Sequence, residues 1–328
     1  MPDVYVAVDD PMLRVGKWLQ ESGYRFVTTT PATHARVNAR TGASVARSLQ
    51  DVFGWSRPFS PSLLPPQVLR WLHDADLIES RDGLMRSKVR FSTLRDSLYA
   101  HSAYPTMEGD SVFFGPDTYR FAELIQRTLA QSRAHVDCIV DIGCGSGAGG
   151  IVAAQAFKHA ALQLILTDIN TAALRYARVN AELSAVPNTC FRQGDLFEVL
   201  DEPADLIIAN PPYLLDPEAR LYRHGGGGLG SGLSTRIVVE GLPYLSAQGT
   251  LILYTGSPIV DSRDAFWESI ASAVQTPNVR YEYAELDPDV FGEELDNPAY
   301  LQVDRIAAVA LVVTKCGPGA NSPASAAQ

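Results

Sequence analysis

The fold of this chain is decided by residues 136–147, which read VDCIVDIGCGSG. A short apolar run ends at Asp141 and breaks into glycines at alternate positions, Gly143, Gly145 and Gly147, before an alanine-rich segment. This order predicts a strand, a tight turn and a helix. Glycines suit a turn where a ligand lies against bare backbone, because a Cβ would intrude there. The spacing also fits the G-x-G-x-x-A form of the dinucleotide fingerprint, so the turn alone leaves several nucleotide-like ligands open.

Two later stretches narrow this choice. The apolar run 162–166 leads into the letters TDIN, and their carboxylate, Asp168, is placed to accept both ribose hydroxyls of an adenosine. The apolar run 206–209 is followed by the tetrad Asn210-Pro211-Pro212-Tyr213. No dehydrogenase pattern predicts that tetrad, so a nicotinamide dinucleotide is disfavoured.

With these motifs the chain resembles the class I S-adenosylmethionine-dependent methyltransferases of the Asn-Pro-Pro-Tyr group, and among them the release-factor glutamine N5-methyltransferase family. The resemblance runs from about residue 109 to 315. These enzymes methylate planar nitrogens, either glutamine side-chain amides in release factors or exocyclic amines of adenine. The resemblance therefore implies S-adenosylmethionine as the cofactor and N-methylation as the activity.

A segment before the glycine turn adds to the resemblance. Residues 109–121 read GDSVFFGPDTYRF and resemble the Pro-x-x-Asp-Thr segment that closes over the cofactor in the glutamine-methylating branch. This implies cofactor contacts for Asp117 and Thr118, although a proline directly before Asp117 departs from the family's spacing. Asp117 is also a candidate N-cap of a helix predicted over 118–129, and both roles can hold together.

The composition describes an ordinary globular protein. Hydrophobic residues make up 46% and charged residues 20% of the 328 positions, enough chain for two domains. No apolar run approaches about 18 residues, so no membrane span is expected, and the first residues lack the pattern of a signal peptide. The four cysteines form no C-x-x-C pair. We therefore expect no metal site, no disulfide framework and a cytoplasmic location.

Charge is unevenly distributed along the chain. Residues 1–105 hold 13 Lys and Arg against 10 Asp and Glu, whereas residues 106–328 hold 14 against 27. An acidic catalytic half argues against broad contact with phosphates, on which nucleic-acid affinity largely rests. A protein or small-molecule substrate is therefore favoured, although the first part of the chain could still hold a nucleic acid.

Three parts are predicted along the chain. Residues 1–105 form an N-terminal substrate or accessory domain, residues 106–315 the methyltransferase domain, and residues 316–328 a disordered tail of low apolar content. In the first part, helices are predicted over 11–21, 35–52 and 67–75, and a hairpin over 77–92.

The helix and hairpin of the first part resemble a winged helix. The basic residues expected on the exposed wing are Arg81, Arg86, Lys88 and Arg90. Such a wing could contact nucleic acid, and a solvated hairpin face is the competing interpretation.

The second part is predicted to be a Rossmann-like α/β sheet of seven strands with helices on both faces, because strands alternate with helices. The expected strands are 136–141, 162–167, 188–192, 204–209, 249–255, 279–286 and 306–314. The expected helices after the glycine turn are 148–158, 171–184, 234–246 and 261–275. The last two strands are expected to form an antiparallel pair, as is typical of this fold.

The cofactor is expected beyond the carboxyl ends of the parallel strands. The backbone of residues 143–147 would face its methionine portion, Asp141 would answer its ammonium, and Asp195 would accept from the adenine amino group. Each such Asp could instead cap the following helix. The residues expected to contact the cofactor are Asp117, Thr118, Asp141, Gly143, Gly145, Gly147, Asp168, Ile169, Asp195, Leu196 and Asn210.

The tetrad is the expected site of chemistry. An amide nitrogen is a poor nucleophile because its lone pair is delocalised. The Asn210 side-chain oxygen and the Pro211 carbonyl could accept from both of its N–H groups and favour charge development there. The prolines, including Pro212, stiffen the loop, and Tyr213 offers a flat face for stacking. A merely structural strand end is the alternative.

Four functions are compatible with these motifs. A protein glutamine methyltransferase, acting on a release-factor-like partner, is favoured by the segment 109–121 and the acidic charge. A nucleic-acid N-methyltransferase acting on adenine N6 or guanine N2 would use the basic hairpin. A small-molecule N-methyltransferase and a non-catalytic cofactor-binding protein remain as alternatives, the last disfavoured by the intact tetrad.

Overall fold

The computed structural model describes residues 10–106, 108–132, 134–157, 159, 161–216 and 218–317. At its centre is a mixed sheet with the strand order β11-β12-β9-β8-β5-β6-β7, which confirms the predicted α/β class. The short strand β10 (Arg263–Asp264) pairs with β9 at one end. The other strands are β5 (Cys138–Ile142), β6 (Gln163–Asp168), β7 (Thr189–Gln193), β8 (Ala204–Ala209), β9 (Leu245–Val260), β11 (Val279–Asp287) and β12 (Arg305–Lys315).

Strand direction divides the sheet into two parts. The strands from β7 to β9 are parallel, whereas β12 runs antiparallel to both β9 and β11, which confirms the expected final pair. Strand β9 begins at Leu245 and is longer than predicted at both ends. The strand order reverses between β5 and β8, and ligands of open α/β sheets bind in the crevice at such a reversal.

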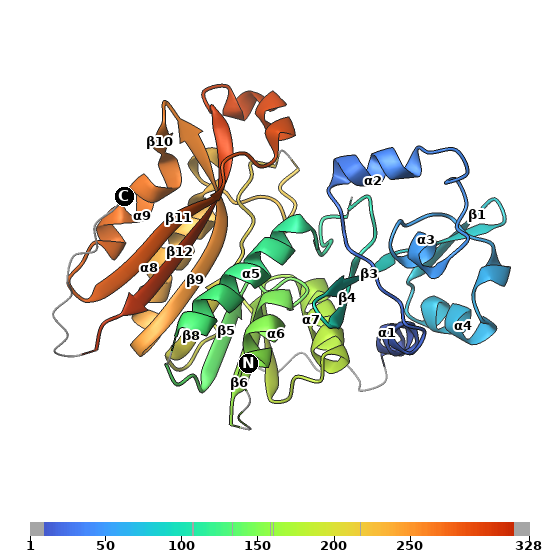
Figure 1. The fold of residues 1–328 in the computed structure, drawn as a ribbon, viewed down its shortest axis with the longest axis horizontal. Helices are drawn as coiled ribbons and strands as arrows, with labels where there is room; N and C mark the ends of the chain where they lie inside the picture. The colour runs from blue at the N-terminus through green and yellow to red at the C-terminus, as the bar shows by residue number, and fades with distance from the viewer. Residues whose placement is uncertain are drawn as a thin grey trace.

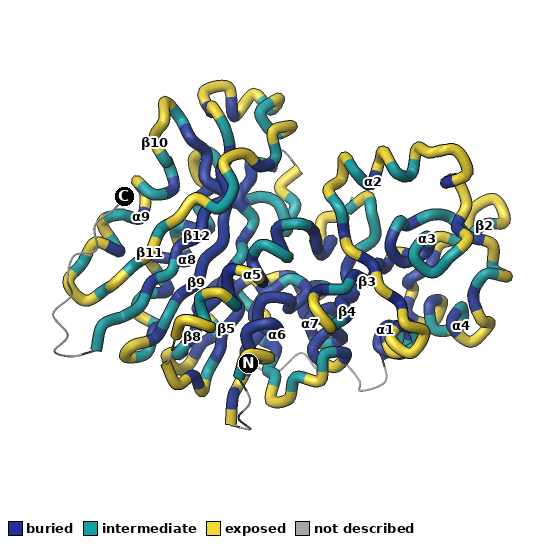
Figure 2. Tube along the Cα trace, viewed as in Figure 1, coloured by how far each residue is buried: buried dark blue, intermediate teal, exposed yellow. Residues whose placement is uncertain are grey.

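Helices cover both faces of the sheet (Figure 1). The strand β5 shows why, since its successive side chains point to opposite faces. Ile139 packs in the core cluster that includes α5, α6 and α7, whereas Val140 packs with α8 and α9. The helices are α5 (Pro116–Gln131), α6 (Ala148–Gln155), α7 (Thr171–Leu183), α8 (Gly232–Gly241) and α9 (Ala265–Val274). Figure 2 shows the central strands as largely buried between these layers, whereas the edge strand β11 is partly exposed.

Three helix boundaries differ from the sequence prediction. Helix α8 ends at Gly241, because a 3-10 turn (Leu242–Tyr244) leads directly into β9. Helix α9 begins at Ala265, where the Asp264 carboxylate accepts from the Trp267 N–H at 2.8 Å. Helix α5 begins at Pro116 with Gly115 as its N-cap. The prediction that Asp117 caps this helix is therefore wrong.

The N-terminal part contains small helices and two hairpins. Its elements are α1 (Pro11–Glu21), α2 (Pro31–Asn38), α3 (Leu49–Phe53), α4 (Pro66–Asp74), β1 (Ile78–Arg81), β2 (Leu84–Ser87), β3 (Val89–Leu94) and β4 (Ser97–Ser102). The helix predicted over 35–52 is wrong, because a turn containing Gly42, with φ +80, separates α2 from α3. Glycine adopts that left-handed conformation without steric cost.

The predicted hairpin is shorter than expected and carries less free positive charge. Strands β1 and β2 form it, whereas β3 pairs with β4 in a second hairpin. Arg90 therefore lies inside the protein, 5% exposed, and its prediction as a wing residue is wrong. Lys88 forms an ion pair with Asp76 at 3.1 Å, and Arg86 donates to the Ser56 carbonyl.

The N-terminal part packs against α7 (Figure 1). The Asn180 amide group on α7 bonds both the N–H and the carbonyl of Ala100 on β4, at 2.7 and 2.9 Å. Arg175 on the same helix donates to Asp10 at the start of α1. These contacts join the two parts closely, and the domain boundary near residue 105 stays a prediction.

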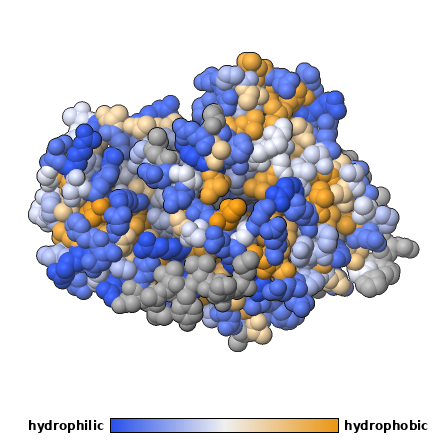
Figure 3. Space-filling view, turned by 180° about the vertical axis from the view of Figure 1, so that it is seen from behind, coloured by the Kyte–Doolittle hydropathy of each residue, from blue (hydrophilic) through white to orange (hydrophobic). Residues whose placement is uncertain are grey.

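The surface seen from behind in Figure 3 is mainly hydrophilic, with apolar side chains in several separate patches. Among the described residues, no helix is long and apolar enough to cross a membrane. Most of the tail predicted to be disordered, from residue 318 onward, lies outside the described residues. The cytoplasmic location stays a prediction.

Candidate functional site

A cavity opens at the carboxyl ends of the central parallel strands. About 230 Å³ of its space is open to water, and it extends from the glycine turn to the tetrad. The sequence-predicted residues that line it are Asp117, Thr118, Asp141, Gly143, Gly145, Asp168, Ile169, Asp195, Leu196, Asn210, Pro211, Pro212 and Tyr213. Gly147 is the exception. It caps α6 with φ +75, and a Cβ there would lie 3.1 Å from Leu166, so this glycine serves helix–strand packing.

The conformation of the glycine turn is fixed by hydrogen bonds to the carboxylate of Asp168. One oxygen accepts from the Gly145 N–H and the other from the Asn170 N–H, each at 2.9 Å. Gly143 and Gly145 both adopt left-handed φ, and a Cβ on either would meet no protein atom within 4 Å. The turn therefore presents bare backbone to the cavity. Burial raises the pKa of Asp168 above its ordinary value.

Asp141 lies beneath the same turn. It is 2% exposed, and its Oδ2 accepts from the Gly150 N–H in the first turn of α6 at 2.7 Å. Burial raises the pKa of Asp141 from 3.8 to about 7, with the Gly150 hydrogen bond opposing this shift. The carboxyl is therefore poised to change charge near neutral pH.

Asp195 and its neighbours form the outer side of the cavity. Asp195 pairs with Arg236 of α8 at 3.1 Å, a contact the sequence did not suggest. Ile169 and Leu196 both line the cavity. Ile169 is 55% exposed, whereas Leu196 is buried. An exposed apolar side chain at a cavity mouth suits a flat ring as its partner.

The tetrad follows β8 and is joined by hydrogen bonds to the first turn of α5. The Tyr213 hydroxyl donates to Asp117 Oδ2 at 2.9 Å, and the Tyr254 hydroxyl donates to Asp117 Oδ1 at 2.7 Å. Burial, with the adjacent Asp117 charge, raises the pKa of Tyr213 well above its ordinary value, so its hydroxyl stays a donor. Arg120 links Asp117 onward to Asp287. Asp117 thus positions the tetrad as well as lining the cavity.

Asn210 differs from its neighbours because its side chain makes no hydrogen bond within the described part of the chain. It is partly exposed at the end of β8, and the buried Pro211 follows it. An amide oxygen that lines a cavity without a protein partner is free to accept from a ligand.

The glycine-rich segment 225–232 backs the tetrad, a role the sequence left open. The Gly225 N–H donates to the Leu214 carbonyl at 2.8 Å. A Cβ at Gly225 would lie 2.0 Å from the Gly230 carbonyl oxygen and 2.7 Å from that of Pro212. Only glycine permits this approach of two backbones, so the segment supports the loop that carries Asn210.

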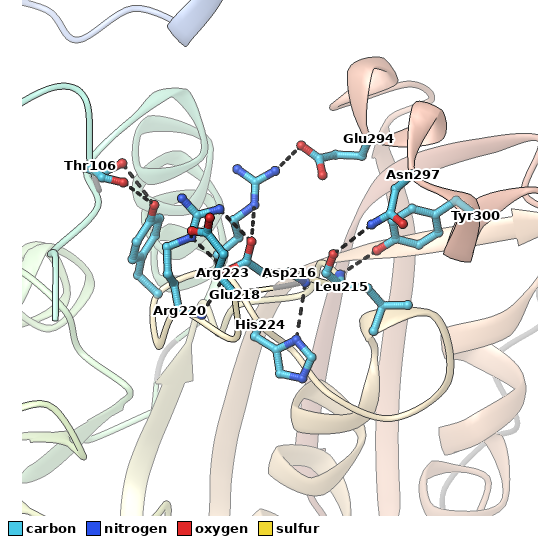
Figure 4. A network of polar contacts seen from close by, with 11 residues as sticks. Thr106, Leu215, Asp216, Glu218, Arg220, Arg223, His224, Glu294, Asn297 and Tyr300 are labelled. Atoms are coloured by element: carbon cyan, nitrogen blue, oxygen red, sulfur yellow. Dashed lines mark hydrogen bonds and ion pairs between the residues drawn. The ribbon is translucent and has the colours of Figure 1, made fainter. Parts of the chain in front are cut away.

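The loop after the tetrad is tied down by ion pairs (Figure 4). Asp216 accepts from the Arg220 guanidinium at 2.8 and 2.6 Å, and this contact lowers the pKa of Asp216 to about 2. Arg223 pairs with Glu294, and Tyr300 accepts from the Leu215 N–H at 2.7 Å. Among the described residues that line the cavity, Arg223 is the one Arg or Lys. Its charge is already balanced, so the cavity is acidic.

Comparison with known proteins identifies the family. The methyltransferase small domain family matches residues 115–255. The ribosomal protein uL3 glutamine methyltransferase of Bordetella pertussis is 37% identical over 150 residues, 41% of this chain and 50% of that protein. Trm5b of Pyrococcus abyssi, a solved structure, is 15% identical with a TM-score of 0.48, covering 73% of this chain and 62% of that one. The chain spans about half the length of the first curated relatives it matches.

One relative is matched over most of its length. The release factor glutamine methyltransferase of Buchnera aphidicola is 31% identical over 196 residues, 55% of this chain and 68% of that protein. The chain therefore belongs to the class I S-adenosylmethionine-dependent methyltransferase family that includes these glutamine methyltransferases, and its cofactor is S-adenosylmethionine.

Proposed function

We propose that the chain transfers a methyl group from S-adenosylmethionine to the side-chain amide nitrogen of a glutamine in a protein substrate. The observation that carries this proposal is the unpartnered side chain of Asn210, which lines the same cavity as the glycine turn. An amide N–H pair is a matching donor for its oxygen. The related proteins named as glutamine methyltransferases support the same acceptor.

The residues of the cavity fit this cofactor. S-adenosylmethionine carries a sulfonium and an ammonium, and the carboxylates of Asp117, Asp141, Asp168 and Asp195 line the cavity. The turn contains no Lys or Arg, which suits a cofactor without phosphates. We assign the methionine portion to the bare backbone of the turn and the ribose to Asp168. When bound, the cofactor supplies an already activated methyl group, so no strong general base is needed.

The protein's own groups would act by positioning the acceptor. The Asn210 oxygen and the Pro211 carbonyl would hold the target nitrogen by its N–H groups and stabilise the positive charge that develops there. Asp117 would fix Tyr213, and with it the tetrad, through a buried hydrogen bond. The segment 225–232 would hold the backbone of the tetrad loop in place through its close backbone contacts.

Charge favours a protein over a nucleic acid as the acceptor. A nucleic acid would bring phosphates towards a cavity whose described lining includes four carboxylates and one balanced arginine. Of the hairpin residues that could have compensated, Arg90 is buried and Lys88 is paired. A peptide amide is neutral and meets no such repulsion.

The acceptor can be identified by methyl transfer from labelled cofactor into cell extract, followed by separation into protein, RNA and small molecules. We expect the label in protein, as N5-methylglutamine on digestion. The Asn210→Ala variant serves as the background control. Label in RNA or in small molecules, dependent on Asn210, would reject the protein acceptor while keeping the methyltransferase chemistry.

Cofactor affinity is expected to rise as pH increases to about 7. Burial holds the pKa of Asp141 at about 7, so below that pH the carboxyl is neutral and cannot attract the cofactor's ammonium. Because binding then requires the carboxyl to lose its proton, the affinity for the cofactor falls by up to about tenfold for each pH unit below 7. Calorimetry between about pH 5.5 and 7.5 measures this slope. Asp141→Asn should remove it, and exposed Asp289→Asn should not. An equal slope in all three proteins would exclude Asp141 as its source.

A further inference from the structure

Arg90 is a buried cation without an acidic partner. It lies on β3, 5% exposed, and its Nε and Nη2 atoms are fully buried with no hydrogen-bond partner in the described part of the chain. None of the ion pairs found among the described residues includes it. The sequence placed this residue on a solvated wing, where its charge would have needed no partner.

One aromatic ring lies beside the guanidinium, and three phenols lie within electrostatic range of it. Its Cζ lies 5.6 Å from the centroid of the Phe26 ring. Burial, the largest effect, lowers the pKa of Arg90 from its ordinary value to about 10, and the phenols of Tyr24, Tyr119 and Tyr104 oppose this shift. Arg90 therefore stays positively charged at neutral pH. A contact with one ring compensates only part of the desolvation of such a charge.

A second unpartnered atom lies near this cation. His34 of α2 is 2% exposed, and its Nδ1 is buried without a hydrogen bond. Its Nε2 lies 2.9 Å from the Trp55 carbonyl oxygen, which fixes the ring. Burial, and after it the charges of Arg90 and Arg57, lower the pKa of His34 to about 4, so the three groups lie within electrostatic range. The ring is therefore neutral, and its Nδ1 is an acceptor that can report on the charge state of Arg90 but cannot donate to an anion. Asp51 balances Arg57, and Arg90 is left uncompensated.

The two unpartnered atoms of Arg90 indicate the kind of ligand. Nε and Nη2 form one edge of the planar guanidinium, and that edge binds two oxygens of a carboxylate or phosphate in parallel hydrogen bonds. A buried water could satisfy either N–H but would leave the charge unpaired, and buried charges in proteins are paired. We propose that Arg90 forms a binding site for one compact oxyanion, a carboxylate or a phosphate.

The Arg90 site is connected through β4 to the segment before α5, part of which lines the cavity. His101 is the partner of Arg90 across the β3–β4 pair, and its ring stacks on Phe114 at 4.9 Å. Tyr119, whose phenol raises the pKa of Arg90, lies in the first turn of α5. The oxyanion would therefore hold β3, β4 and α5 together. It does not depend on the proposed methyl transfer, because none of the residues that form it lines the cavity.

The test is the thermal midpoint of the full chain in increasing inorganic phosphate, against chloride at equal ionic strength. Wild type should show a saturable rise, about 5 °C at 100 times Kd, because the ligand binds the folded state alone. Arg90→Met should lose the response while removing an unpaired buried charge. Arg90→Lys, which keeps the charge but lacks the two parallel N–H donors of the guanidinium, should bind phosphate at least tenfold more weakly. Arg81→Met, an equal loss of charge at an exposed position, should respond like wild type.

Acetate in place of phosphate separates the two sources of oxyanion. A saturable response to acetate assigns a carboxylate ligand, and a response to phosphate alone assigns a phosphate. No saturable response in wild type to either anion, or an equal response in Arg90→Met, overturns the proposal and leaves buried water as the partner of Arg90. Should Arg90→Met fail to fold, the His34 ring resonances of wild type decide. They must shift with the anion at the Kd of the thermal titration, and unchanged resonances also overturn the site.

Discussion

Asn210→Ala is expected to lower the rate of methyl transfer by roughly 10²–10³ while leaving cofactor affinity nearly unchanged. The Asn210 side chain lines the cavity and makes no hydrogen bond to another described residue, so its removal breaks none of those bonds. Its oxygen is expected to contribute mainly in the transition state, when the acceptor nitrogen gains positive charge. Single-turnover methylation with saturating cofactor measures this effect separately from binding.

Asn210→Asp sharpens the test of the same residue. It keeps the shape and the acceptor capacity but adds a negative charge, which could draw the sulfonium into an unproductive position. We expect activity below wild type and above the alanine variant. Asn278→Ala, at an exposed position away from the cavity, is the matched control. Equal rates for wild type and Asn210→Ala would mean that the tetrad is structural and that the chemistry lies elsewhere.

Asp117→Ala is expected to destabilise the protein strongly. Asp117 is 4% exposed and accepts from the hydroxyls of Tyr213 and Tyr254, which are themselves buried. The substitution leaves both hydroxyls without an acceptor, at a cost of about 1–3 kcal/mol for each one. Urea unfolding at neutral pH measures the loss of free energy. Activity should also fall, because Tyr213 belongs to the tetrad.

Removing the two tyrosine hydroxyls that Asp117→Ala leaves without an acceptor should restore part of the lost stability. Adding Tyr213→Phe and Tyr254→Phe to Asp117→Ala eliminates the unpaired hydroxyls, and replacing both partners by apolar groups is close to neutral. Exposed Asp289→Ala controls for the loss of a negative charge. A triple variant no more stable than Asp117→Ala would show that the hydroxyls are not the source of the destabilisation.

Local pattern was sufficient for much of the fold and for the location of the site. The seven strands and the glycine turn follow from apolar runs and backbone freedom, which act over a few residues. Asp141, Asp168 and Asn210 follow those runs directly, and parallel strands bring their carboxyl ends to one edge of the sheet. Every residue that the sequence predicted for the site except Gly147 lines the cavity, whereas other lining residues, among them Tyr222, Arg223 and Phe291, were not predicted.

Only the tertiary structure determined the hydrogen-bond and charge partners of the polar side chains. Asp117 looked like a helix cap, but its partners Tyr213 and Tyr254 are distant in the chain and meet it only when β8, β9 and α5 pack together. Arg90 looked like a wing residue because alternation along a strand cannot reveal what later covers its face. The structure buries it beside the Phe26 ring, and the described residues offer it no acidic partner. Spacing is a local property, whereas the pairing of a buried charge depends on the whole fold.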